Sequence, residues 1–469
     1  MIWRMILKEL TTNILELRFL VCATLCVLLG VVSVFVLRAD LEIRQQDFHS
    51  NRDLYRKQAE EYGSYQSLQS QGLRVDRPPQ NFQALFYGLE KTPDRTAVIS
   101  SDFLPGFQGD LNSNPLVLMF PVADLYFVVG VVLSLLAFFM SFDAISGERE
   151  TGTLKLLLSY SVPRGAIILS KWVGGYLSLA LPFGVTMLLS ALIINTSGDI
   201  AFTSSDWQAF AVSAVVSLLL ISVMFSFGLF VSVRAQRSST AILQLLFLWV
   251  FVALVLPNSG PYIAELVSPI PDVAQVERQI AEKVKGLTDQ FRGTWRRGGR
   301  GRRDMTPAQR SAFFAEVTAK REELRRATNE ASEEIIRDFE RKLRFQTDVA
   351  RTVSRISPIA SYAYASTDIG ETGVRHEYQL VSGLRQYQRE FRRYLDEKVS
   401  ESPGGGGFGN FGGSTDEDYS IDDMPTFEYH AEDVGARLDS RTTDVLLLVI
   451  FAVLFFLLAF VSFLKADIN

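Results

Sequence analysis

The sequence contains few of the residues from which catalytic and metal sites are built. Its 469 residues include two cysteines and three histidines, and the histidines (His49, His376 and His430) are scattered along the chain. No GxxxxGKS/T, HExxH, CxxC or GxSxG motif occurs in it. Nucleotide binding through a P-loop, zinc-dependent hydrolysis and serine hydrolysis therefore have no support. We expect a non-catalytic protein with no cofactor and no metal of its own.

The small number of cysteines excludes a disulfide-stabilised external domain. Cys22 and Cys26 lie four residues apart inside a hydrophobic run, so they share one helix face and cannot link distant segments. We interpret them as packing residues rather than redox or metal-binding groups. The chain also lacks a net positive charge, since its formal net charge is −5. No nucleic-acid partner is expected.

Charge is nearly absent from six hydrophobic runs, with Gln244 as the main strongly polar residue inside them. Each run has about the 20 residues that a helix needs to cross the bilayer, where backbone groups must pair within their own segment. Proton-driven transporters use ionisable groups in the membrane, so this class is disfavoured. The predicted fold class is an all-α polytopic membrane protein with a mainly helical extracytoplasmic domain. Its six transmembrane helices are expected at residues 19–37, 123–142, 173–195, 208–233, 240–256 and 443–464.

Lysine and arginine in the short loops predict the orientation, since they favour the cytoplasmic side. They precede span one, lie between spans two and three and between spans four and five, and follow span six, whereas the 196–207 loop has none. Both termini are therefore expected in the cytoplasm, with an uncleaved first span. The expected cytoplasmic segments are the amphipathic residues 1–18, the 143–172 segment, the 234–239 loop and the 465–469 tail.

Two long segments, 38–122 and 257–441, are then extracytoplasmic together with the short 196–207 loop. The charged residues 40–69 are expected to prolong span one as a helix until Arg77-Pro78-Pro79 stops it. Residues 273–287 and 307–353 are also expected to be helical. The second of these carries an apolar stripe at three- and four-residue steps, which predicts a paired helical hairpin.

Two low-complexity tracts interrupt the second long segment. Residues 292–303, rich in Arg and Gly, are interpreted as a solvated turn, with binding to an anionic partner such as lipid headgroups as the alternative. Residues 403–413 are interpreted as a flexible Gly-rich linker. Its Gly407, Gly409 and Gly412 spell GxGxxG, but no strand precedes them and no helix follows at once, so dinucleotide binding is not expected.

The most informative part of the chain is Ser146 to Trp172, between spans two and three. Two acidic residues stand near the start of an expected short helix, where they interact favourably with the helix dipole. Three leucines form its apolar edge, a proline breaks it, and Lys171 and Trp172 are expected to anchor span three at the interface. A force on this segment would reach spans two and three together. The alternative interpretation is an ordinary interfacial connector. The two acidic residues are Glu148 and Glu150, the three leucines are Leu154, Leu157 and Leu158, and the proline is Pro163.

The stretch FDAISGERETGTLKLLLSYSVPRGAIILSKWVGGYLSLALPF, residues 142–183, closely resembles ABC-2 type transporter permeases. It is most similar to the bacterial group that includes NosY-like and gliding-associated permeases with a large extracytoplasmic domain. In that family the corresponding motif forms a cytoplasmic coupling helix that docks on an ATP-hydrolysing subunit. Ser357-Pro358 and residues 77–89 resemble the large-loop subgroup more loosely. The resemblance implies that coupling is carried by Glu148, Glu150, Gly152, Thr153, Leu154, Leu157, Pro163 and Arg164.

The resemblance implies a permease subunit of the bacterial inner membrane that couples ATP hydrolysis by a separate ATPase to export or other movement of a lipid, peptide or amphipathic substrate. ATP and Mg would be bound by the partner. The implied partners are an ATPase dimer, a second permease that is identical or related, membrane lipids and, as a further option, a periplasmic protein. The alternative is an ATPase-driven mechanical or scaffold protein that acts on a periplasmic partner without moving cargo. A membrane-embedded hydrolase is disfavoured because no nucleophile or metal constellation is present.

Overall fold

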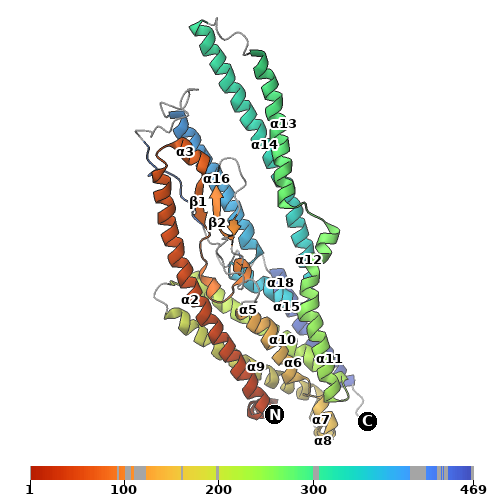
Figure 1. Cartoon of the computed structure of the whole chain (residues 1–469). Helices are drawn as coiled ribbons and strands as arrows, with labels where there is room; N and C mark the ends of the chain where they lie inside the picture. Colours follow the sequence, from red (N-terminus) through yellow and green to blue (C-terminus); the bar gives the residue numbers. More distant parts are fainter. Residues whose placement is uncertain are drawn as a thin grey trace. The chain divides into compact units, whose positions relative to one another are not determined.

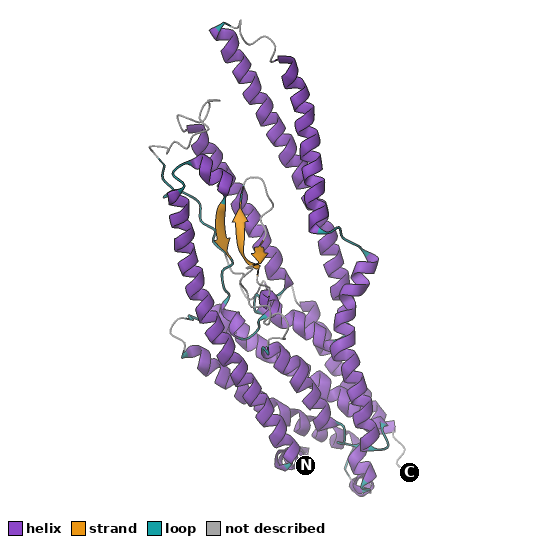
Figure 2. Ribbon diagram, in the orientation of Figure 1, coloured by secondary structure: helices purple, strands orange, loops and turns teal. Residues whose placement is uncertain are grey.

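The structure, a computed structural model, is mostly helical (Figure 1, Figure 2). Two compact units make up the chain, one of residues 1–253 and 358–469 and the other of residues 254–357. The Gly-rich linker expected at 403–413 lies outside the described residues. The described residues are 2–91, 94–100, 107–109, 123–159, 162–196, 200–298, 306–401, 419–429, 435, 437 and 442–465.

Six of the described helices are long and apolar enough to cross a membrane, which confirms the mostly helical class and the six candidate spans. The second span combines α5 (Leu125–Phe127), the π-helix η3 (Val128–Leu133), α6 (Ser134–Ser141) and α7 (Ser146–Glu150). The fifth combines α11 (Ser238–Val250), the π-helix η4 (Phe251–Val255) and α12 (Leu256–Val267). The single-helix spans are α2 (Leu17–Glu61), α9 (Arg164–Asn195), α10 (Ser204–Arg234) and α18 (Thr442–Lys465).

Helix α2 is longer than a bilayer requires. Its 45 residues extend over about 68 Å at about 1.5 Å per residue, more than twice the hydrocarbon thickness. The helical extension expected beyond span one is therefore present, and it is continuous with the span. It ends at Glu61, well before the prolines, because Gly63 with φ 65° adopts the left-handed conformation that terminates helices.

Small residues bring the spans of the first unit close together. Three helix pairs meet at a glycine: α2 with α9 at Gly30, α9 with α10 at Gly175, and α10 with α6 at Gly228. A Cβ added at these positions would lie 2.2 Å, 2.1 Å and 1.9 Å from the nearest side-chain atom of the facing helix. Close approach at small residues is how membrane helices gain packing contacts without a hydrophobic driving force.

A small antiparallel sheet belongs to the same unit and was not predicted from the sequence. It consists of β1 (Leu73–Asp76), β2 (Asp94–Ile99) and β3 (Phe107–Gly109), with Leu73 opposite Ile99. Strands this short contain too few residues for an alternation of apolar and polar side chains to be recognised. The buried face of the sheet shares a hydrophobic cluster with α3 (Tyr65–Gln71) and α16 (Val374–Glu401). The first long segment, 38–122, therefore folds together with the α16 part of the second.

Two regions that resemble the large-loop subgroup more loosely, residues 77–89 and the helix after Ser357, pack in the main hydrophobic core. Residues 81–84 form the short helix η1 (Asn81–Ala84), whose Phe82 is buried in the same cluster as Tyr362 of α15 (Pro358–Ile369). The Tyr362 hydroxyl lies 3.0 Å from Ser217 Oγ of α10. Helix α15 is therefore part of the membrane-helix core and not of a separate external domain.

Gly88, at the start of η2 (Gly88–Lys91), is required by the junction with the α15–α16 turn. Its φ is +55°, and an added Cβ would lie 2.1 Å from the carbonyl oxygen of Thr372. That carbonyl also accepts a hydrogen bond from the Leu89 N–H at 2.9 Å, so it cannot move away freely.

We expect Gly88→Ala to lower the free energy of unfolding by about 2 kcal/mol or more. The alanine Cβ would clash with the Thr372 carbonyl oxygen, and a residue with a Cβ is strained in the left-handed conformation. The midpoint of thermal unfolding of the detergent-solubilised protein measures the effect. Gly286→Ala is the control, since a Cβ there meets nothing within 4 Å and alanine favours helix. An unchanged midpoint for Gly88→Ala would contradict this account of the junction.

The second unit consists of α12, α13 (Val273–Gly298) and α14 (Pro307–Ser354), with α13 packed against α14 as the predicted hairpin requires. Gly260 of α12 touches α14, where a Cβ would lie 2.5 Å from the Ala350 carbonyl oxygen. The interpretation of 292–303 as a turn is wrong for its first part, because α13 continues as helix to Gly298. Residues 299–305 lie outside the described part of the chain.

Candidate functional site

The 143–172 segment forms two short helices at the ends of spans two and three. Helix α7 follows α6 after four residues, and α7 and α8 (Thr153–Ser159) lie together at the lower end of the view in Figure 1. The turn between α7 and α8 depends on Gly152, whose φ is +74°. Nothing lies within 4 Å of a Cβ built there, so the glycine is needed for its backbone conformation and not for space.

Helix α7 is held against the junction between α10 and α11. The backbone N–H groups of Ile145 and Ser146 donate to Ser232 Oγ at 3.1 Å and 3.2 Å. The guanidinium group of Arg149 donates to the carbonyl oxygens of Val233 and Ala235 at 3.1 Å and 2.7 Å. Cations that bind the last carbonyls of a helix also interact favourably with its dipole. Movement of α7 would therefore reach α10 directly.

A buried lysine connects α7 to two other helices. Lys171 of α9 is 6% exposed, and its Nζ lies 2.8 Å from Glu148 Oε1 and 3.4 Å from Glu9 Oε1 of α1 (Ile2–Leu15). The second carboxylate oxygen of Glu148 is buried and accepts no hydrogen bond from the described residues. We expected Lys171 to be an interface anchor; the structure buries it as the shared partner of two carboxylates.

Leu154 fixes α8 to the membrane helices. It is 1% exposed and lies in a hydrophobic cluster with residues of α9, α10 and α18. Leu157 and Leu158 pack against the same cluster and are partly buried. The apolar edge expected from the sequence is thus the face by which α8 attaches to its own protein. The buried members of the cluster are Ile145, Leu154, Ile167, Ile168, Leu229, Val233, Ala459 and Phe463.

The opposite face of α8 is exposed and includes an apolar residue that the sequence reasoning missed. Leu156 is 65% exposed, and Thr153 and Lys155 beside it are also exposed, as is Glu150 at the end of α7. The spacing of Leu154, Leu157 and Leu158 could have revealed this, because it leaves Leu156 about 200° away around the helix from Leu154. Leu156 is therefore an exposed apolar side chain beside exposed polar ones.

Pro163 and Arg164 lie where the segment enters span three. Pro163 is the N-cap residue of α9, with φ −60°, and its carbonyl accepts the Ala166 N–H at 2.9 Å. Arg164 Nη1 donates to the carbonyl oxygen of Leu464 at the end of α18, at 3.1 Å. The segment thereby contacts α1, α9, α10, α11 and α18. Of the eight residues predicted to carry coupling, Glu150, Thr153, Pro163 and Arg164 are exposed, whereas Leu154 is buried.

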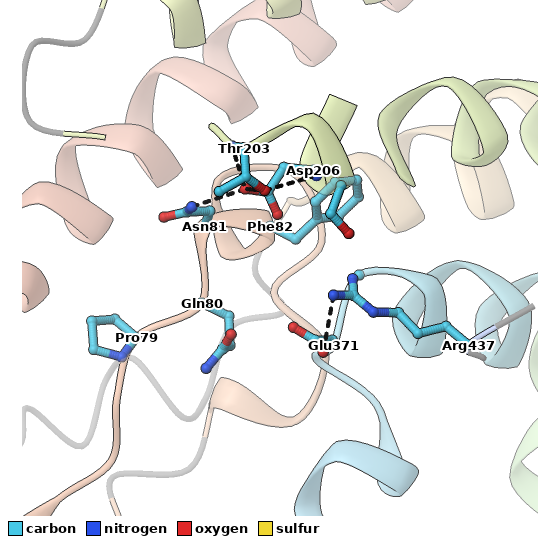
Figure 3. Close-up of a pocket in the computed structure, with 10 residues that line it drawn as sticks. Pro79, Gln80, Asn81, Phe82, Thr203, Asp206, Glu371 and Arg437 are labelled. Atoms are coloured by element: carbon cyan, nitrogen blue, oxygen red, sulfur yellow. Dashed lines mark hydrogen bonds and ion pairs between the residues drawn. The ribbon is translucent and has the colours of Figure 1, made fainter. Parts of the chain in front are cut away.

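A second polar site lies at the other end of α10 (Figure 3). It is a cavity of about 420 Å³, lined by residues of η1, the start of α10 and the α15–α16 turn. Arg437 Nη2 lies 3.1 Å from Glu371 Oε1, and Asn81 Nδ2 donates to Asp206 Oδ2 at 3.1 Å. Thr203 and Asp206 form the capping box of α10. The first pair links Arg437 to the α15–α16 turn, and the second links η1 to the start of α10.

No cluster of three or more His, Cys, Asp or Glu side chains is placed to hold a metal ion within the described ranges. The chain is nevertheless recognisable by comparison with known proteins. Residues 3–468 match the model of the family described as ABC-2 family transporter protein. Two curated relatives carry the name "Probable ABC transporter permease protein NosY".

The relative from Pseudomonas aeruginosa is 36% identical over 137 residues, which cover 28% of this chain and 48% of the relative. The relative from Stutzerimonas stutzeri is 35% identical over 138 residues, which cover 29% of this chain and 49% of the relative. The chain therefore spans about half the length of the curated relatives that it matches.

Proposed function

The chain belongs to the ABC-2 transporter family, and on this basis we propose that its 143–172 segment docks on a separate ATPase subunit and transmits the movement that accompanies ATP hydrolysis to the spans. It is a non-catalytic membrane subunit of a multi-pass type, and membership of this permease family implies a partner ATPase. Glu150, Thr153 and Leu156 form the docking face in this proposal. Glu148, Leu154 and Arg164 transmit the movement.

The observation that carries the proposal is the division of α8 into two faces. Leu154 is buried among residues of α9, α10 and α18, while Leu156 is exposed on the opposite side. A helix that is attached to the membrane helices by one face and presents a leucine on the other can receive a push and pass it on.

The proposed orientation places this segment in the cytoplasm of a bacterium, with both termini on the same side of the inner membrane. The contacts of the segment support this arrangement. Arg18 forms an ion pair with Asp143, Arg149 binds the end of α10, and Arg164 binds the end of α18. The basic residues of the short loops are therefore gathered at one end of the unit, as expected for a cytoplasmic surface.

We propose an assembly of two permease chains, identical or related, on an ATPase dimer that binds ATP and Mg. Export of a lipid, peptide or other amphipathic substrate is the proposed direction and cargo class. Direction and cargo class rest on the family resemblance alone. The lack of charge in the spans supports only the ATPase as the energy source.

Purification with the cognate ATPase tests the proposal. The chain in nanodiscs should form a stable complex with the ATPase and change its rate of ATP hydrolysis. A chain that neither binds the ATPase nor alters its rate would overturn the docking proposal.

A mechanical role is a second candidate, favoured by one observation. The α13–α14 hairpin is charged along most of its length, and α14 alone has 48 residues, far more than a span needs. Such a hairpin suits contact with a periplasmic protein. Reconstitution in vesicles separates the two functions, since a transporter moves cargo when ATP is added, whereas a scaffold rearranges the hairpin without moving cargo.

A further inference from the structure

A cationic cavity lies where α10 ends and α11 begins, outside the docking face described above. Its volume is about 630 Å³, within the range of small-molecule sites. Arg234 and Arg237 line it, and neither has a carboxylate within ion-pair distance among the described residues. Both side chains are exposed, and the Arg234 guanidinium lies 5.9 Å from the centre of the Phe230 ring.

The start of α11 adds to the preference for an anion. Arg237 is the N-cap residue of α11 and its side chain makes no cap hydrogen bond, so the positive end of the helix dipole adds to the charge of the two arginines. Thr240 and Gln244 line the same cavity one and two turns further along. The cavity therefore offers two guanidinium groups, a hydroxyl and an amide from adjoining positions.

The polarity of α11 changes along this face in the order found in a phospholipid. Arg237, Thr240 and Gln244 are separated by three and four residues, and the same spacing continues to Phe247 and Phe251. Phe247 and Phe251 are 74% and 44% exposed. Because α10 and α11 are membrane-span candidates, the cationic end lies at the membrane surface and the aromatic end within the hydrocarbon. Gln244 lies about 10 Å deeper than Arg237 along the helix, which explains a strongly polar side chain inside a span.

We propose that this cavity binds the phosphate headgroup of an anionic membrane phospholipid, with one acyl chain along Phe247 and Phe251. Arg234 and Arg237 bind the phosphate oxygens, and Thr240 and Gln244 bind the oxygens below it. The inference is independent of the ATPase docking proposed above, because none of these residues belongs to the docking face.

Native mass spectrometry of the full chain tests the proposal. Protein released from nanodiscs that contain phosphatidylglycerol should retain one such lipid more than protein from phosphatidylcholine nanodiscs. The R234Q/R237Q variant should lose roughly tenfold or more in affinity for that lipid. Phe247→Ser should weaken binding of the same lipid with both arginines intact, because it removes part of the acyl-chain surface.

The control variant is R4Q/K8Q, which removes two exposed charges of α1 and should leave the retained lipid in place. Equal retention by R234Q/R237Q and the native chain would overturn the proposal, as would equal losses in R234Q/R237Q and R4Q/K8Q, which would indicate general surface charge only. Displacement of the lipid by millimolar inorganic phosphate would overturn the acyl-chain part. Loss of ATPase binding in R234Q/R237Q with lipid retention unchanged would identify the cavity as a protein contact instead.

Discussion

Leu156→Asp is expected to weaken the complex with the partner ATPase by about 30-fold or more, the effect of losing about 2 kcal/mol at an interface. The side chain is 65% exposed on α8, so the substitution removes an apolar contact and places a charge in it without disturbing the core. Titration of the ATPase against the chain in nanodiscs measures the effect, and ATP-dependent transport should fall in parallel. The unfolding midpoint should stay unchanged.

Leu54→Asp is the matched control, since Leu54 is an exposed leucine of α2 away from the 143–172 segment. It should leave ATPase binding intact. Glu150→Lys, on the same exposed face as Leu156, should weaken binding, and Glu150→Gln less so. If Leu156→Asp and Leu54→Asp bind the ATPase equally well, the exposed face of α8 is not the docking surface.

Lys171→Met is expected to destabilise the protein by about 3 kcal/mol, the lower end of the range for a broken buried pair, because it removes the buried cation shared by the partly exposed carboxylates of Glu9 and Glu148. The expected result is a large fall in the unfolding midpoint, together with loss of coupling in the protein that remains folded. Thermal unfolding in detergent and ATPase stimulation in nanodiscs measure the two effects.

Removing the two carboxylates as well should reverse most of this loss. The E9Q/E148Q/K171M variant should unfold at a higher temperature than Lys171→Met alone, since no unpaired charge then remains buried. Lys155→Met, which removes an exposed lysine of α8, should change stability by less than about 0.5 kcal/mol. A triple variant no more stable than the single one would show that Lys171 contributes packing and not charge pairing.

The fold could be predicted from the sequence where long patterns exist. The six apolar runs, the extension of span one and the helix from Pro307 follow from composition and periodicity over many residues. The β1–β3 sheet could not be predicted, because its strands are short and are stabilised by α16, which lies about 300 residues further along the chain. The burial of α15 in the core depends likewise on Tyr362 meeting Ser217.

The candidate site shows the same division between local and distant information. The end of α8 before Pro163 and the apolar edge of α8 are local features and could be read from the sequence. The break at Gly152 was not predicted, because one short helix was expected where the structure has α7 and α8. Which face of α8 is buried depends on Leu229 and Phe463, and the burial of Lys171 depends on Glu9, 162 positions away. No local pattern contains these pairings.

Accessibility of the 143–172 segment tests the central claim most directly. A single cysteine is introduced as S159C, at an exposed position of α8, in a chain whose buried Cys22 and Cys26 are replaced by alanine. R52C, in the exposed part of α2, serves as the comparison. We predict that a membrane-impermeant maleimide labels R52C in intact cells, labels S159C only in inside-out vesicles, and is excluded from S159C by added ATPase. Labelling of S159C in intact cells would contradict the account.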